Sequence, residues 1–261
     1  MDRGVFYVAY GKKFVEEAVL SAKSVKECMP SLSISIASDI DPNSEVFDNL
    51  YEIDVDKNKY TPTFLFLDKS PYDKTIHFDT DVYVNGSVYE IFDMMEKWDL
   101  LATHAPYREQ TDVGIPSAFP EINGGVLAFN NNKYFKKFYS NWKRNYRKIG
   151  RDTEQPSLRK TLYESDMDFY ILPPEYNARD IGYLHGEAKI FHFREYTNLE
   201  RTMEKINSTE EQRVYYHSWR GVKVIENRHP ISARIWKSVN EKGIIITLKK
   251  GLNRIMRSVS S

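Results

Sequence analysis

The first forty residues of this chain have the pattern of a strand, a helix and a second strand, and this unit constrains the fold most. Residues 5–9 form a short apolar run, which predicts a buried strand. From Phe14 to Met29 apolar side chains recur at helical spacing, and Pro30 ends the run. Residues 32–37 alternate serine with leucine or isoleucine, as strands do. A β-α-β unit with such short connections predicts a parallel sheet covered by helices.

Strand-like and helix-like segments continue to alternate to about residue 195. We expect further strands at 75–78, 100–104, 126–129, 169–172 and 189–193, and helices at 88–95, 134–146 and about 153–163. Residues 105–121 hold three prolines and are expected to form a loop. The alternation predicts a doubly wound α/β domain, whose ligands bind beyond the carboxyl ends of the strands. Residues 1–195 are expected to form this domain, and residues 196–261 a C-terminal extension that completes it.

The composition excludes several classes of partner and site. Lysine plus arginine and aspartate plus glutamate each number 37, so no overall field favours nucleic acid. The single cysteine, Cys28, excludes an intramolecular disulfide, and its apolar-periodic surroundings favour a buried thiol. We find no secretory signal and no apolar window long enough to cross a bilayer, which predicts a cytoplasmic location.

Two aspartates, Asp79 and Asp81, directly follow the apolar strand expected at 75–78. Residues two apart on an extended chain point to the same side, so these carboxylates can lie next to each other. Adjacent carboxylates repel unless they share a proton or a cation. Mg²⁺ or Mn²⁺ accepts carboxylate oxygens together with diphosphate oxygens. The pair therefore predicts a metal site, with a solvated turn as the alternative.

A second enzyme class uses similar residues. Haloacid-dehalogenase-like phosphatases place an Asp-x-Asp motif after a hydrophobic strand, and there Asp79 would be the nucleophile. That class also needs a later pair of acidic residues at a strand end, which we do not find. Its motif normally opens the domain, whereas here a β-α-β unit precedes it.

Four segments resemble, in the same order, family-8-like glycosyltransferases of the GT-A nucleotide-diphospho-sugar transferase fold. They are residues 70–84 around the aspartates, 122–130 with Asn123-Gly124-Gly125, 154–158 with Glu154-Gln155, and 189–193 with His192. The resemblance implies a Rossmann-like, mostly parallel sheet flanked by helices, with a C-terminal helical appendage. It implies a hexosyl- or pentosyltransferase that retains anomeric configuration. The donor would be a UDP-linked sugar, and the acceptor a glycan, a lipid-linked sugar or a protein.

The resemblance also assigns roles to individual residues. Asp79, Asp81 and His192 would bind Mn²⁺ or Mg²⁺, since a neutral imidazole can join two carboxylates around such an ion, and His185 is the alternative third ligand. The donor-binding candidates are Ala9, Tyr10, Asp39, Lys74, Thr80, Asn123, Gly124 and Gly125.

The donor-binding candidates have different expected roles. Tyr10 can stack on uracil and Asp39 can accept hydrogen bonds from the base or ribose, although Tyr10 can equally be ordinary packing. Lys74 can neutralise donor phosphate or lie on the surface. Gly124 and Gly125 would let the backbone approach the sugar closely, with an ordinary tight turn as the alternative.

Glu154 and Gln155 are the catalytic candidates. They lie at the expected N-terminus of a helix, where partial positive charge favours an anionic or acceptor group. The resemblance places them near the reacting carbon of the sugar, with Glu154 where the family has aspartate. Glu154 can be a nucleophile, a hydrogen-bond partner of a sugar hydroxyl, or simply a helix-capping acid.

The last twenty residues, 242–261, are basic without any acid and carry apolar residues at helical spacing. Such a helix can contact an anionic membrane surface peripherally, or it can pack on the domain with its basic face in water. A different alternative concerns the whole chain: a non-catalytic module that binds a nucleotide sugar or glycan on the same fold.

Overall fold

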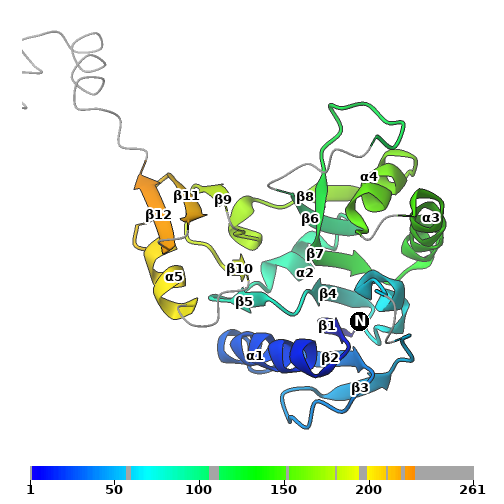
Figure 1. Cartoon of the computed structure of the whole chain (residues 1–261), viewed down its shortest axis with the longest axis horizontal. Helices are drawn as coiled ribbons and strands as arrows, with labels where there is room; N and C mark the ends of the chain where they lie inside the picture. Colours follow the sequence, from blue (N-terminus) through cyan, green and yellow to red (C-terminus); the bar gives the residue numbers. More distant parts are fainter. Residues whose placement is uncertain are drawn as a thin grey trace, which may run out of the picture.

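The computed structural model describes residues 2–56, 60–105, 112–150, 153–179, 181–193, 199–209, 211–218 and 221–226. A seven-stranded sheet forms its centre (Figure 1). Its strands, in chain order, are β1 (Arg3–Ala9), β2 (Ser33–Ser38), β3 (Asn49–Glu52), β4 (Lys74–Phe78), β6 (Leu100–His104), β7 (Ile122–Asn130) and β8 (Phe169–Ile171).

The strand order across this sheet is β3-β2-β1-β4-β7-β6-β8. All strand pairs are parallel except those of β7, which is antiparallel to both β4 and β6. Because β7 runs the other way, its first residues lie at the edge where β1 and β4 end. This reversal brings residues 122–125 to the carboxyl ends of the parallel strands.

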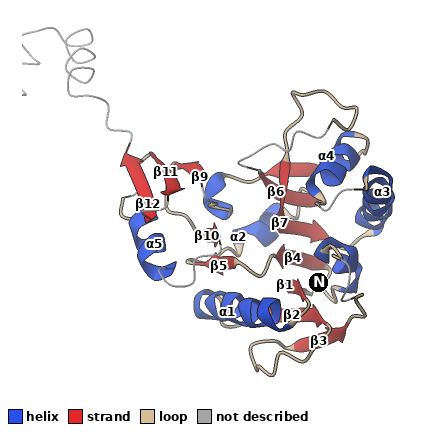
Figure 2. Cartoon of the chain, in the orientation of Figure 1, coloured by secondary structure: helices blue, strands red, loops and turns tan. Residues whose placement is uncertain are grey.

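Helices cover both faces of the sheet, as Figure 2 shows. The helices α1 (Lys12–Cys28) and α2 (Glu90–Met94) share one apolar core with the sheet. The 3₁₀ helix η1 (Thr63–Lys69) and the helices α3 (Lys133–Ile149) and α4 (Gln155–Tyr163) share the other. Strand β1 shows the alternation: Val5 and Tyr7 belong to the first core, and Phe6 and Val8 to the second.

A smaller group of elements adjoins this sheet. The strand β5 (Val82–Val84) follows the aspartates and pairs antiparallel with β10 (Ile190–His192). A three-stranded antiparallel sheet contains β9 (Ile181–Leu184), β11 (Arg213–Ser218) and β12 (Gly221–Glu226). The helix α5 (Leu199–Ile206) contributes to a third core with these strands, and η2 (Pro174–Tyr176) precedes β9.

The predicted α/β architecture, a mostly parallel sheet flanked by helices, is confirmed. Strand β7 begins at Ile122, four residues before the expected start, because Asn123, Gly124 and Gly125 belong to the strand. The extension is not purely helical, since its described part consists of α5, β11 and β12. Residues 227–261 lie outside the described residues, so the membrane prediction for 242–261 stays a prediction. None of the helices in the described ranges combines the length and apolarity that a membrane span requires.

Candidate metal centre

Three strands bring Asp79, Asp81 and His192 together. Asp79 follows the last residue of β4, and its backbone N–H donates to the carbonyl of Gly125 on β7. Asp81 immediately precedes β5, and its carbonyl accepts from the N–H of Phe193. In the β5–β10 ladder His192 lies opposite Val82, so its side chain lies next to the aspartates.

The three side chains form a compact donor set. Nε2 of His192 lies 3.3 Å from Oδ1 of Asp81 and 3.6 Å from Oδ2 of Asp79. One ligand atom from each residue lies within 4.8 Å of the others, and this is the one such group among the described residues. Around an octahedral cation with bonds of about 2.1 Å, neighbouring ligands lie about 3 Å apart and opposite ones about 4 Å. The donor set therefore fits a small divalent cation.

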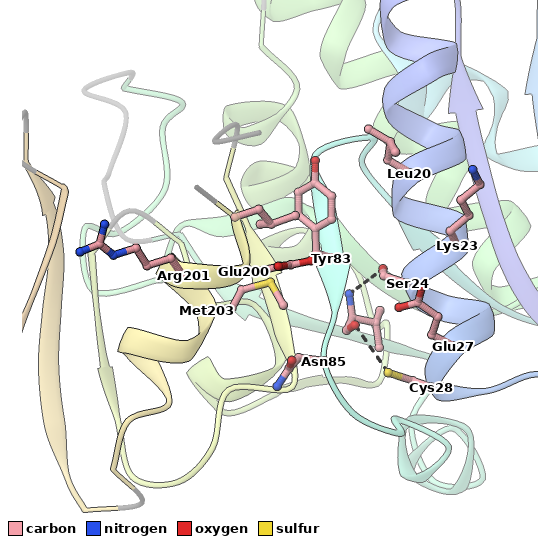
Figure 3. A pocket seen from close by; sticks show the side chains of 12 residues that line it. Leu20, Lys23, Ser24, Glu27, Cys28, Tyr83, Asn85, Glu200, Arg201 and Met203 are labelled. Carbon is pink, nitrogen blue, oxygen red and sulfur yellow. Dashed lines mark hydrogen bonds between the residues drawn. The ribbon is translucent and has the colours of Figure 1, made fainter. Parts of the chain in front are cut away.

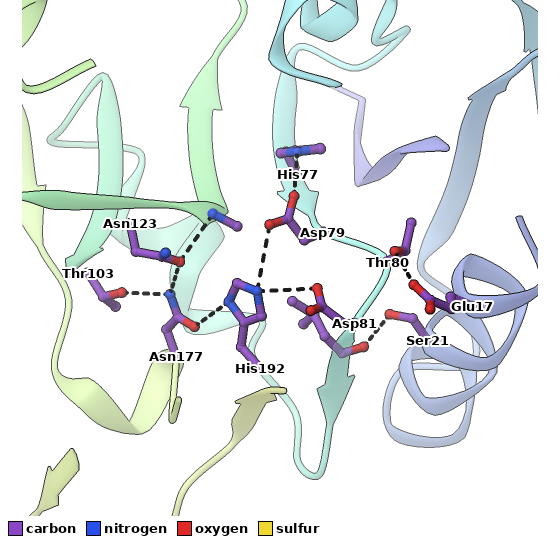
Figure 4. A network of polar contacts seen from close by, with 12 residues as sticks. Glu17, Ser21, His77, Asp79, Thr80, Asp81, Thr103, Asn123, Asn177 and His192 are labelled. Carbon is purple, nitrogen blue, oxygen red and sulfur yellow. Dashed lines mark hydrogen bonds and ion pairs between the residues drawn. The ribbon is translucent and has the colours of Figure 1, made fainter. Parts of the chain in front are cut away.

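A buried chain of amides supports His192 from behind (Figure 4). Nδ1 of His192 lies 3.0 Å from Oδ1 of Asn177, whose amide nitrogen donates to Asn123 Oδ1 and Thr103 Oγ1, both at 2.8 Å. Asn123 Oδ1 also accepts from the backbone N–H of Gly125 at 3.1 Å. Asn123 is thus part of the support of the centre, whereas Asn177 and Thr103 were not among the predicted site residues.

The residue between the two aspartates is held by helix α1. The hydroxyl of Thr80 donates to Oε2 of Glu17 at 2.8 Å, and both side chains are buried. His77 lies two residues before Asp79 in the sequence. Its Nε2 is 3.8 Å from Asp79 Oδ1, and its Nδ1 bonds to the carbonyl of Phe6. Burial lowers the pKa of His77, which favours a neutral ring there.

A pocket of about 330 Å³ opens beside the aspartates, and we call it the aspartate pocket. It is lined by Val8, Tyr10, Phe14, Tyr60, Thr63, Asp79, Thr80, Asp81 and Glu154. The hydroxyl of Tyr10 donates to the carbonyl of Thr61 at 2.8 Å, which connects β1 to the chain before η1. Tyr60 is largely exposed, but desolvation of its hydroxyl and the nearby charge of Glu154 raise its pKa above the ordinary value. Tyr60, Phe14 and Thr63 were not among the predicted site residues, and Phe14 was predicted only as part of the apolar helical run.

The glycine pair lies against site side chains. A Cβ atom on Gly125 would overlap the His192 ring and lie 2.5 Å from Oδ2 of Asp79. A Cβ atom on Gly124 would lie 2.8 Å from Oε1 of Glu154. We predicted a close approach of the glycine backbone to the sugar. In the structure the backbone closely approaches Asp79, His192 and Glu154.

Glu154 and Gln155 are located at the start of α4, as predicted. Glu154 lines the aspartate pocket, and its backbone carbonyl accepts from Ser157 Oγ and from the N–H of Leu158. Its side chain does not cap the helix. Oε1 of Gln155 is buried and has no hydrogen-bond partner among the described residues. A buried amide oxygen without a partner can accept a hydrogen bond from a bound hydroxyl.

Of the remaining predicted residues, Ala9 and Asp39 lie at the carboxyl edge of the sheet, and Lys74 lies at the opposite edge. Ala9 ends β1, and Asp39 follows β2, where its Oδ1 accepts from the N–H of Gly11 at 2.8 Å and shapes the turn into α1. Lys74 requires a correction. It is the first residue of β4, at the end opposite Asp79, and its ammonium bonds to Glu96 and to the carbonyl of Phe92. It therefore cannot neutralise a phosphate held at the aspartates.

His185, the alternative ligand, lies outside the metal-ligand group. Its Nδ1 is 3.1 Å from the amide nitrogen of Gln212, and its ring packs edge-on against Tyr183. The described residues also contain no further acidic pair beside Asp79 of the kind that a phosphatase site needs.

A second hollow, of about 590 Å³, lies between α1 and α5 along β5 (Figure 3). Tyr83, Lys23 and Arg201 are among its lining residues. Ser24 Oγ accepts from the N–H of Val84, and Cys28 Sγ contacts the carbonyl of the same residue, so α1 fixes β5 here. Cys28 is half-buried and not fully buried as predicted, because its side chain lies at the edge of α1 beside this hollow.

Several solved structures are similar to this chain. A galactosyltransferase, LgtC, in complex with donor and acceptor sugar analogs, superposes with a TM-score of 0.55 over 90% of this chain and 99% of that one, at 16% identity. The glycosyltransferase GlyE of Streptococcus pneumoniae TIGR4 gives 0.54 over 75% of this chain, at 15% identity. Mouse xyloside xylosyltransferase 1 gives 0.52 over 74% of this chain and 98% of that one, at 14% identity.

The chain spans 56% of the length of GlyE. No protein-family model matches the chain, and no curated protein sequence does. At these identities the structural likeness establishes the fold, which is the GT-A fold that the sequence resemblance implied. These three neighbours are glycosyltransferases.

Proposed function

We propose that this chain is a glycosyltransferase that transfers a sugar from a nucleoside-diphosphate donor, UDP-linked, to a glycan, lipid-linked or protein acceptor. The observation that carries the proposal is the Asp79–Asp81–His192 donor set at the carboxyl edge of the sheet, with the aspartate pocket beside it. Ligands of open α/β sheets bind at this edge. The fold shared with glycosyltransferases supports the same reaction class.

Each part of the site has a proposed task. Asp79, Asp81 and His192 would hold Mn²⁺ or Mg²⁺, which supplies positive charge to the departing diphosphate. Tyr10 would stack on the base, since it lines the pocket at the end of β1. Asp39 and Ala9 lie at the same edge, where the nucleoside would bind. Thr80 would face the diphosphate in the pocket, and the Asn123–Gly125 segment would hold His192, Asp79 and Glu154 in place.

In the proposed reaction the bond between the anomeric carbon and the diphosphate oxygen breaks, and its electron pair stays on the diphosphate. The acceptor oxygen bonds to the anomeric carbon and its proton passes to a base. Glu154 is the acid that lines the pocket beside Asp79, and we assign it to stabilise or attack this carbon with retention of configuration. Gln155 would accept a hydrogen bond from a sugar hydroxyl through its unpartnered Oε1.

A donor panel tests the proposal. Thermal shift of the whole chain with Mn²⁺ and each of several nucleotide sugars should show stabilisation by one donor class, because a ligand that binds only the folded state raises Tm. The same donor should be hydrolysed slowly without an acceptor. A non-catalytic binding module would show stabilisation without hydrolysis or transfer. Neither stabilisation nor hydrolysis across the panel would refute the proposal.

A further inference from the structure

Asn177 lies behind the metal-ligand group, where its Oδ1 is 3.0 Å from Nδ1 of His192. It follows η2, and its backbone is connected to the strand that carries His192. The N–H of Ala178 donates to the carbonyl of Ile190 at 2.8 Å, and the N–H of His192 donates to the carbonyl of Ala178 at 2.9 Å. These bonds fix the Asn177 side chain relative to the His192 ring.

The hydrogen bonds determine which way the Asn177 amide points. A backbone N–H can only donate, so the Asn123 atom that faces Gly125 must be the amide oxygen. The Asn177 atom that lies 2.8 Å from this oxygen must then be a donor, namely the amide nitrogen. Oδ1 of Asn177 is consequently the atom that faces Nδ1 of His192, at 3.0 Å. A carbonyl oxygen only accepts, so His192 Nδ1 has to carry a proton.

We propose that Asn177 is a positioning residue that holds His192 protonated on Nδ1, so that in the neutral ring the lone pair of Nε2 faces Asp79 and Asp81. This proposal rests on the proposed function, in which these three side chains bind a divalent cation. A metal-ligating histidine needs its second nitrogen fixed by a neighbouring acceptor, which sets both the ring orientation and the tautomer.

The competing tautomer shows why such an acceptor matters. Two carboxylate oxygens lie 3.3 and 3.6 Å from Nε2 and attract a proton to that nitrogen. A neutral ring protonated on Nε2 would bind the aspartates directly and would offer no lone pair to a cation. Asn177 opposes this outcome from the other side of the ring.

Nitrogen NMR of the metal-free protein tests the tautomer directly, with His192→Gln used to assign the signal among the six histidines. At about pH 8, where an ordinary histidine is neutral, the wild-type spectrum should show a proton on Nδ1 of His192. A wild-type ring without a proton on Nδ1 would overturn the proposal. This measurement needs no metal, so it decides the tautomer of His192 even where the metal proposal fails.

The second experiment compares Asn177→Leu with Asn145→Leu. Asn145 in α3 is also a buried amide. It donates to Thr161 Oγ1 and to Glu164, and these bonds do not involve the metal ligands. Asn177→Leu should move the His192 proton to Nε2 and weaken Mn²⁺ binding, measured by electron paramagnetic resonance, by about 10- to 100-fold. Asn145→Leu should change neither quantity. An unchanged tautomer and an unchanged Mn²⁺ affinity in Asn177→Leu would refute the proposal.

Discussion

The carboxylate of Glu154 lies against the bare backbone of Gly124: a Cβ atom added to that glycine would be 2.8 Å from Oε1 of Glu154. Glu154 directly precedes α4, and Gly124 lies near the start of β7. At position 154 the resembled family has the shorter aspartate. The space left by the absent side chain at position 124 is therefore the space that the longer glutamate occupies.

Gly124→Ala should displace Glu154 and lower kcat for transfer by about 10²-fold, because a misplacement of about 1 Å can cost that much. Donor binding should change little, since the metal ligands stay in place. Gly186→Ala is the control, because a Cβ atom there meets no atom within 4 Å. Combining Gly124→Ala with Glu154→Asp should recover part of the loss. A kcat equal to wild type in Gly124→Ala would contradict the assigned position of Glu154.

Gly125→Ala should act on the metal instead. The new methyl group would collide with the His192 ring and with Oδ2 of Asp79, so both ligands must move. We expect Mn²⁺ affinity, measured by calorimetry, to fall by at least about 10-fold. Gly86→Ala is the matched control, since its nearest neighbour would be Lys189 Cγ at an ordinary 3.7 Å. Undiminished Mn²⁺ binding in Gly125→Ala would show that the ligands lie elsewhere.

The loop that precedes β7 depends on a buried ion pair. Arg159 Nε lies 3.7 Å from Oε2 of Glu121, and the guanidinium also donates to the carbonyls of Pro116 and Phe119. Arg159→Met should lower the free energy of unfolding by about 3 kcal/mol, because it leaves a carboxylate in a buried site without its cation. Chemical denaturation would measure this change. Lys160→Met, which breaks the partly exposed pair with Glu164, should cost less than about 1 kcal/mol. Equal effects of the two substitutions would contradict the interpretation.

An acid-sensitive contact joins α2 to the start of β10. Burial alone would raise the pKa of Glu90, but hydrogen bonds from Lys189 and Tyr176 outweigh it and lower the pKa below its ordinary 4.5. A carboxyl with a lowered folded-state pKa stabilises the fold above about pH 4.5 and loses that contribution as the pH falls through the folded value. Glu90→Gln should therefore lower Tm slightly at about pH 7. The loss in the free energy of unfolding should be less than about 1 kcal/mol, because the pair is partly exposed. The difference from wild type should disappear in acid. A difference that grows as the pH falls would contradict this sign.

Much of this architecture could be predicted from short-range patterns. The apolar periodicity of residues 5–37 predicted β1, α1 and β2, and the position of Asp79 after an apolar strand predicted a site at the sheet edge. The structure groups Asp79, Asp81 and His192 within ligand distance. Residue patterns cannot give the direction of β7, whose reversal places Gly124 and Gly125 inside the strand and against Glu154, Asp79 and His192.

The site residues that were not predicted have roles that depend on contacts between segments far apart in the sequence. Asn177 is 15 residues from His192, and Glu17 is 63 residues from Thr80. Neither pair belongs to a sequence motif with a recognisable spacing. The prediction for Lys74 was wrong because Lys74 is close to Asp79 in sequence but not in space. Strand β4 lies between them and puts the two residues at its opposite ends.

The proposed function requires that Asp79, Asp81 and His192 bind a divalent cation that holds the diphosphate of the donor. Calorimetric titration of UDP into the protein tests it most directly, with Mn²⁺, with a chelator, and with Asp81→Asn in the presence of Mn²⁺. We expect saturable UDP binding only for the wild-type protein with Mn²⁺. UDP binding of equal affinity in the chelator, or in Asp81→Asn, would contradict it.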